Sequence, residues 1–154
     1  MAARFIDAIY CDDIRNEAGG KHSLMGVYGN ALFAREYPLT LPRFCVAVRL
    51  VMPIEESLEG VRLVVLLEDQ ELASVELGTA DHEEARRQVE EQERTLGGAV
   101  LLGEDPERIN LINMHFMFSP LQVAQPSILR IRLQGLEDPP RAPALAFAQR
   151  STQP

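Results

Sequence analysis

The ten residues RFCVAVRLVM, Arg43 to Met52, alternate strictly between two kinds of position. Every second residue is large and apolar: Phe44, Val46, Val48, Leu50 and Met52. A period of two is the pattern of a β-strand with one buried face. The segment therefore predicts a strand whose apolar face belongs to the core.

Further segments of the same kind follow along the chain. Residues 61–77 read as a hairpin that turns at Asp69-Gln70, and in 127–135 Arg130 and Arg132 alternate with Leu129, Ile131 and Leu133. The remaining predicted strands are 5–12, 23–28, 112–118 and 144–147. Many short strands without interleaved helices predict an all-β fold, an antiparallel β-sandwich of about eight strands.

One segment interrupts this pattern. In DHEEARRQVEEQERTLGG, Asp81 could cap the N-terminus of a helix, and Gly97-Gly98 could end it. Its apolar stripe consists of Ala85, Val89 and Leu96 alone, too little to bury a helix firmly. We expect a short helical or irregular insertion near 81–96, exposed between two strands.

The length of 154 residues suits one domain, which we place at 1–148 with a flexible tail at 149–154. The longest aliphatic run is Leu63 to Leu67, far short of a membrane span. These features predict a cytoplasmic protein with no membrane contact. Cys11 and Cys45 are then expected to be reduced, buried and without a disulfide.

The formal net charge of -8 bears on the kind of partner. An acidic surface repels phosphate backbones, and the densest basic spot, Arg86-Arg87, is surrounded by glutamates. The sequence therefore predicts no nucleic-acid partner.

The stretch YCDDIRNEAGGKHSLMGVY, Tyr10 to Tyr28, concentrates the residues that could carry chemistry. Its Gly-Gly-Lys fails as a phosphate-binding loop, because the positions that need glycine and Ser or Thr hold Arg15 and His22. His82-Glu83 fails as a zinc-protease helix, because Arg86 stands where histidine is required. We predict no catalytic residue, no metal site and no cofactor.

A hairpin explains the same stretch more simply. Folded about Asn16-Glu17-Ala18-Gly19, it places Asp13 opposite His22 and turns Asp12 to the other face. The alternative is an acidic ligand-binding site. Its candidate ligand-binding residues are Asp12, Asp13, Glu17, His22 and His115.

The Cys-Asp-Asp-Ile-Arg run, the Gly-Lys-x-Ser-Leu-x-Gly-Val-Tyr run and the Leu-Pro-x-x-Cys run resemble a family of uncharacterised bacterial proteins known only as a domain of unknown function. The resemblance is clearest over Phe5–Pro53 and returns at FMFSPLQVAQPSILRIRL. It implies a small β-sandwich in a bacterial cytoplasm and transfers no catalytic residue.

Three functions remain open. The first is a non-catalytic module that binds a protein partner or itself, a homodimer included, through the edge strands of the sandwich. The second is a small-molecule or metal-ion binder that uses the acidic 12–22 hairpin. The third is a hydrolase with an unrecognised site. A cleft joining Asp12 or Asp13 to His115 would favour the last two, and an apolar patch at a sheet edge would favour the first.

Overall fold

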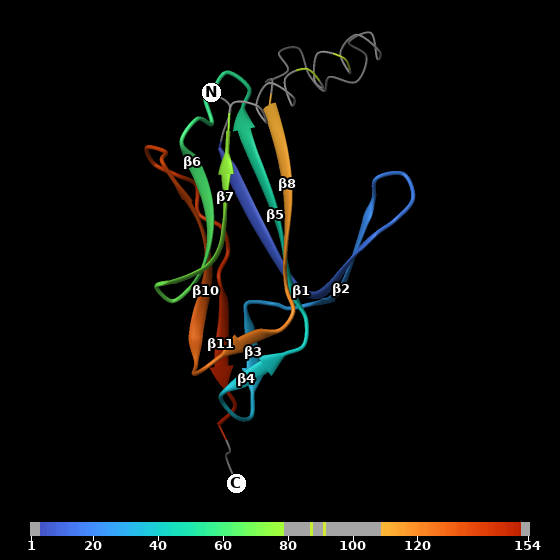
Figure 1. Ribbon diagram of the computed structural model, residues 1–154, viewed down its shortest axis with the longest axis vertical. Helices are drawn as coiled ribbons and strands as arrows, with labels where there is room; N and C mark the ends of the chain where they lie inside the picture. The colour runs from blue at the N-terminus through green and yellow to red at the C-terminus, as the bar shows by residue number, and fades with distance from the viewer. Residues whose placement is uncertain (1–3, 79–86, 88–90, 92–108, 152–154) are drawn as a thin grey trace.

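The computed structural model describes residues 4–78, 87, 91 and 109–151. Their fold is all-β, with two larger sheets that lie against one another along the long axis of the molecule (Figure 1). The first sheet has four strands in the order β2 (His22–Val27), β1 (Phe5–Asn16), β5 (Phe44–Pro53) and β8 (Ile109–Phe118). All of its neighbouring strands are antiparallel.

The second sheet has five strands. Their order is β3 (Ala31–Ala34), β11 (Leu145–Gln149), β10 (Ser127–Gln134), β6 (Val61–Leu67) and β7 (Gln70–Leu77). Its pairs are antiparallel except β11 with β3, which is parallel. A small third sheet pairs β4 (Leu39–Leu41) with β9 (Leu121–Val123).

The core lies between the two larger sheets and follows the predicted alternation. The five alternating residues of β5, from Phe44 to Met52, are all buried, with Val48 only 2% exposed. From the facing sheet, the predicted inward side of β10 is buried as well. The rings of Phe44 and Phe147 join the sheets, with their centroids 6.0 Å apart. The all-β sandwich prediction is therefore confirmed.

The described residues form eleven strands, more than the eight expected. The three additional strands, β3, β4 and β9, have only three or four residues, too few to display a period of two. The last strand runs to Gln149, one residue beyond the predicted domain boundary. The insertion predicted near 81–96 lies outside the described residues, apart from positions 87 and 91.

None of the described residues belongs to a helix that is long and apolar enough to span a bilayer.

The predicted register of the first hairpin is wrong. His22 pairs with Asn16, and Asp13 pairs with Met25. The loop has five residues, closed by a hydrogen bond of 2.8 Å from the Glu17 amide to the Lys21 carbonyl, whereas a four-residue loop was predicted. Because loop length and position fix hairpin register, the longer loop at residues 17–21 moves the partner of His22 three positions along β1, from Asp13 to Asn16.

Candidate functional site

The end of the first hairpin, from Asp12 to Val27, forms an arm that leaves the body of the protein (Figure 1). We call it the β1–β2 arm. It begins at a break in the ladder, where Cys11 pairs with Val27 and the next pair is Asp13 with Met25. Gly26 has φ of +63° here, and a Cβ added to it would overlap the Asp12 carboxylate. The chain bends at this break, where Gly26 lies against Asp12, and the bend requires glycine at position 26.

Asp12 anchors the arm to the core. Its Oδ1 accepts a hydrogen bond from the Tyr28 hydroxyl, and the Tyr28 ring stacks on Phe44 with a centroid distance of 5.9 Å. Burial, and then the bond to Asp12, raise the pKa of Tyr28 far above its ordinary value. Asp12 thus has a structural partner.

The other two carboxylates of the predicted acidic site have separate partners. Asp13 pairs with Arg43, with 3.0 Å between Oδ1 and Nη1, and more distantly with Arg15. Glu17 accepts a hydrogen bond of 2.8 Å from the Ser23 hydroxyl. Within the part of the chain that the structure describes, no three His, Cys, Asp or Glu side chains form a group suited to a metal ion.

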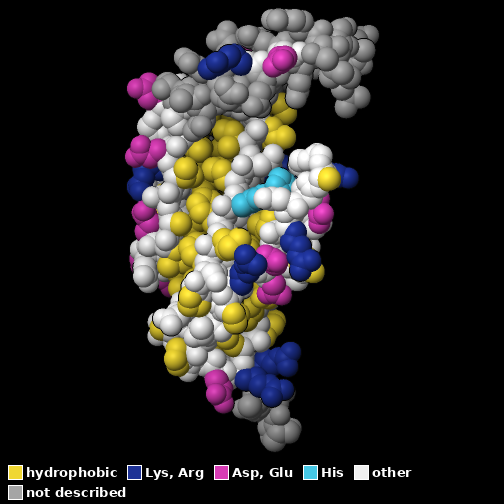
Figure 2. Space-filling model, turned by 45° about the vertical axis from the view of Figure 1, so that its right-hand side comes forward, with side chains coloured by type: hydrophobic (Ala, Val, Ile, Leu, Met, Phe, Trp, Pro, Cys, Tyr) yellow, Lys and Arg dark blue, Asp and Glu magenta, His cyan; other side chains and the backbone are white. Residues whose placement is uncertain are grey.

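The structure does bring together the two histidines of the predicted set. The rings of His22 and His115 meet edge to face, with centroids 4.5 Å apart. They lie beside one another where the arm approaches the body (cyan, Figure 2). Burial, and then the proximity of His22, lower the pKa of His115 below its ordinary 6.5.

The histidine pair lines an open groove of about 550 Å³ between the arm and the outer face of the first sheet. Asp7 and Arg49 also line this groove, whereas Asp12 and Asp13 do not. Arg49 makes no ion pair or side-chain hydrogen bond with any described residue. This groove therefore does not join Asp12 or Asp13 to His115.

The side chains on this outer face are arranged in rows across three strands. Phe5, Val51 and Leu111 are register neighbours and form an apolar row. The next rows along the strands are Asp7–Arg49–Asn113 and Ile9–Ala47–His115. Phe5 is 52% and Leu111 49% exposed, so the apolar row is open to a partner.

Strand β8 is the edge of this sheet, since it pairs only with β5 among the described residues. Its ten residues, INLINMHFMF, include no Lys, Arg, Asp, Glu or Pro. Ile109, Leu111 and Met117 are exposed on the outer face. On the inner face, Ile112, Met114, Phe116 and Phe118 are only partly buried. By contrast, the edge strand β7 of the second sheet has Glu71 and Glu76 exposed.

Edge strands are ordinarily protected from pairing by charges, proline or short length. β8 has none of these features. The alternation in this segment predicts the strand, but His115 is its only residue in the predicted binding set. The absence of charged residues over ten consecutive positions was the signal that could have identified this edge.

The two cysteines lie under the base of the arm. Cys11 and Cys45 are register neighbours on β1 and β5, and both are free thiols. Both side chains are buried, which confirms the prediction that they are buried. Burial is the main cause that raises the pKa of Cys11 to about 11, and it raises the pKa of Cys45 as well. Neither thiol is poised to act as a nucleophile at neutral pH.

No curated protein and no solved structure is significantly similar to this chain. A model of a protein family of unknown function (DUF6941) matches residues 6–139. The match covers most of the chain, in agreement with the resemblance seen in its N-terminal motifs. The chain belongs to this family of unknown function.

Proposed function

We propose that this protein is a non-catalytic module that self-associates by pairing its edge strand β8 with β8 of a second copy. The observation that supports this most strongly is the strand itself. It is an edge strand that pairs with no further strand among the described residues, and it has apolar side chains on both faces and no charge. Such a strand resembles one that is buried on both faces within a sheet.

The sequence of β8 is complementary to itself. Two copies related by a two-fold axis at Met114 would pair antiparallel, as isologous contacts require. Leu111 would then lie opposite Met117 of the second copy, and Ile112 opposite Phe116 of the second copy. Asn113 would meet His115 of the second copy. Within residues 111–117, apolar residues thus meet apolar residues on both faces, and the polar pair lies beside the axis.

Electrostatics also favours this location. Each copy has a net charge of -8, so two copies repel one another over most of their surfaces. An uncharged edge is where this repulsion costs least. Pairing would also cover the partly buried inner residues of β8, including Met114 and Phe116, and extend the four-stranded sheet to a continuous one across both copies.

We also propose that the protein resides in the cytoplasm, and both this location and the absence of catalysis have their own support. Both thiols are buried and have raised pKa values, and the groove beneath the arm is lined by no serine, threonine or cysteine. The hydrolase hypothesis therefore gains nothing from these residues. Two buried cysteines opposite one another suit a reducing compartment.

A second candidate function is the binding of a small anionic molecule in the groove. The supporting observation is that His22, His115 and Arg49 line the same open volume. Titration of labelled protein with a dicarboxylate such as succinate should then shift the His22 and His115 ring signals together. Unmoved ring signals up to millimolar succinate would dismiss this candidate.

Light scattering coupled to size exclusion tests the main proposal. The full chain should run as a dimer at micromolar concentration, and Leu111→Lys should shift it to monomer. Phe33→Lys is the matched control, because Phe33 is 59% exposed and lies on the edge strand β3 of the other sheet. This variant should remain a dimer. Both substitutions replace exposed side chains, so both variants should fold.

A wild-type chain that stays monomeric up to about 100 μM, a concentration that would still reveal a contact of about -5.5 kcal/mol, would contradict the proposal. A dimer that survives Leu111→Lys but is lost in Phe33→Lys would place the contact on the second sheet instead.

A further inference from the structure

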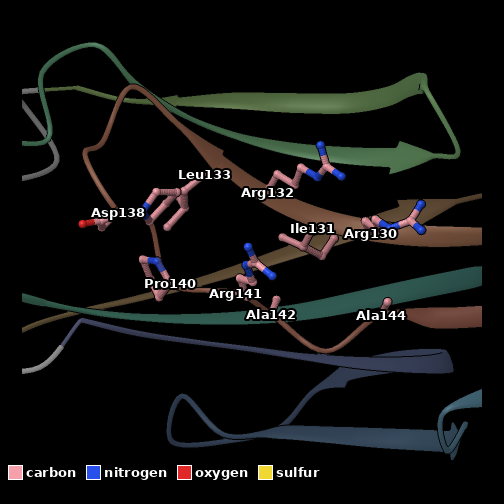
Figure 3. Close-up of a pocket in the computed structure, with 10 residues that line it drawn as sticks. Arg130, Ile131, Arg132, Leu133, Asp138, Pro140, Arg141, Ala142 and Ala144 are labelled. Atoms are coloured by element: carbon pink, nitrogen blue, oxygen red, sulfur yellow. The ribbon is translucent and has the colours of Figure 1, made fainter.

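A second site lies on the other sheet, where β10 separates from β11. These strands pair only from Ser127 to Leu129 on the β10 side. Beyond Leu129, β10 continues to pair with β6, but its other edge has no strand partner among the described residues. Residues 136–144, here called the return segment, run alongside that edge, and an open pocket of about 630 Å³ lies between them (Figure 3).

The sequence keeps the return segment out of the sheet. Gly135 ends β10 with φ of +88°, and a Cβ added to it would overlap the Gly60 carbonyl oxygen. Pro139, Pro140 and Pro143 follow, and proline has no N–H to donate to a ladder. The pocket between β10 and the return segment therefore follows from the sequence, which prevents this segment from pairing with β10.

Two contacts from the N-terminal part of the chain hold the return segment in place. The Tyr10 hydroxyl donates a hydrogen bond of 2.6 Å to the Pro143 carbonyl. The Arg4 guanidinium donates to the carbonyls of Glu137 and Asp138, and it is also paired with Glu56. The wall of the pocket is thus fixed at both ends, so a ligand would meet a preorganised site.

Three arginines line this pocket against a single carboxylate, that of Asp138. Arg130 and Arg132 project from β10, and Arg141 points from the return segment toward β10 (Figure 3). Arg130 has a distant partner in Glu68, at 3.7 Å. Arg132 and Arg141 make no ion pair or side-chain hydrogen bond within the described part of the chain.

Two guanidinium groups without a carboxylate partner among the described residues line one pocket, on a chain with a net charge of -8. Repulsion by the rest of the surface disfavours long polyanions, but a small anion that enters the pocket meets mainly the arginines. A guanidinium group binds two oxygens of a phosphate or carboxylate at once, and its long side chain can turn toward the anion.

The geometry points to a binding site for a small phosphate monoester, held through its phosphoryl group by Arg132 and Arg141. In Figure 3 the Arg132 side chain is directed toward β6 and that of Arg141 toward β10, so Arg132 would turn to share one anion with Arg141. Two positive charges suit a dianion better than an anion with a single charge. The volume is within the range of ordinary small-molecule pockets. Pro139, Pro140 and Ala142 supply an apolar wall for the remainder of the ligand. The pocket lies on the second sheet, so this inference does not depend on β8 pairing.

Calorimetric titration of the full chain with phenyl phosphate at pH 7.5 tests the assignment. We expect saturable binding to one site per chain with a Kd of about 0.1–1 mM, ordinary for a contact through one charged group. Arg132→Gln and Arg141→Gln should each weaken it about tenfold, as expected for the loss of a charge-assisted hydrogen bond. Arg35→Gln, at an exposed arginine outside the pocket, should leave the Kd within about twofold.

Benzoate serves as the comparison anion, since it has an aromatic ring and a single charge. It should bind more weakly than phenyl phosphate. Equal or tighter binding of benzoate would overturn the phosphate assignment. Absence of saturable binding below about 10 mM, or equal weakening by Arg35→Gln, would overturn the site itself. Thermal unfolding of each variant verifies that the exposed substitutions leave the fold intact.

Discussion

The imidazole rings of His22 and His115 meet edge to face, with their planes at 86° and their centroids 4.5 Å apart. This contact joins the β1–β2 arm to the edge strand β8. It is the one place where two residues of the predicted binding set come together. Because His22 contributes to the lowered pKa of His115, we expect protonation of His115 to weaken this contact.

The pKa of His115 is lowered, first by burial and then by His22. A lowered folded pKa means that the unfolded chain binds the proton more readily. The contribution of His115 to stability is therefore fully present above pH 6.5 and is lost as pH falls from 6.5 through the folded pKa. Denaturant unfolding between pH 5 and pH 8 checks this direction, because stability should decline on the acid side.

Replacement of the neighbouring ring separates the two causes. His22→Gln should raise the pKa of His115, measured by NMR titration, but only part of the way to 6.5, because burial is the larger cause. Asp13→Asn is the control, since Asp13 pairs with Arg43 outside the groove. If Asp13→Asn moved the His115 titration as far as His22→Gln does, the position of the arm given above would be wrong.

The bend at Gly26 predicts a localised loss of stability. Gly26→Ala introduces a Cβ that overlaps the Asp12 carboxylate, at a residue with positive φ. It should lower the free energy of unfolding by about 1–3 kcal/mol and abolish the NOE contacts between His22 and His115. Gly29→Ala is the matched control, because an added Cβ there meets no atom within 4 Å. An equal effect of the two substitutions would argue against the bend.

Val48 tests the assignment of the core. It is 2% exposed at the centre of β5, so Val48→Ala should leave a cavity and lower the free energy of unfolding by about 1–3 kcal/mol. Val27→Ala, at a side chain that is 57% exposed, should cost less than about 0.5 kcal/mol. Chemical denaturation of both variants gives the comparison, and a cost below about 0.5 kcal/mol at Val48 would mean that the wrong face of β5 was placed inside.

The cysteines predict the reactivity of the native chain. Cys11 and Cys45 are fully buried and their thiolates are disfavoured, so a thiol reagent should label neither within minutes at pH 7. In denaturant, two thiols should be counted. One thiol that reacts in the native state would show that the bend at Asp12 opens, and no thiols in denaturant would reveal a disulfide between these neighbours.

The sequence was sufficient for those parts of the fold that depend on alternation. Val48 and Leu129 were placed in the core correctly, because a period of two assigns each side chain to one face. Short strands such as Leu39–Leu41 were not predicted, because three residues are too few to show a period of two. The hairpin register escaped because a five-residue loop and a four-residue loop fit the same residues, and packing of the arm decides between them.

The candidate site was less accessible from the sequence. His115 could be named, but its meeting with His22 depends on how the arm bends at Gly26 over the sheet. Arg132 lies on β10 and Arg141 on the return segment, and only the failure of this segment to pair with β10 creates the pocket between them. In both cases the relevant distance is set by a departure from regular pairing, which residue periodicity does not encode.

Amide hydrogen exchange along Ile109–Phe118 at two protein concentrations tests the pairing of β8 most directly. In an unpaired β8, the amide hydrogens that point away from β5 exchange rapidly with solvent. Pairing with a second copy would protect these amides from exchange. We expect alternate β8 amides to be protected at high micromolar concentration and to lose that protection on dilution or in Leu111→Lys, while β5 amides stay protected throughout. Protection of β8 that is independent of concentration, or absent at every concentration, would contradict self-association through this strand.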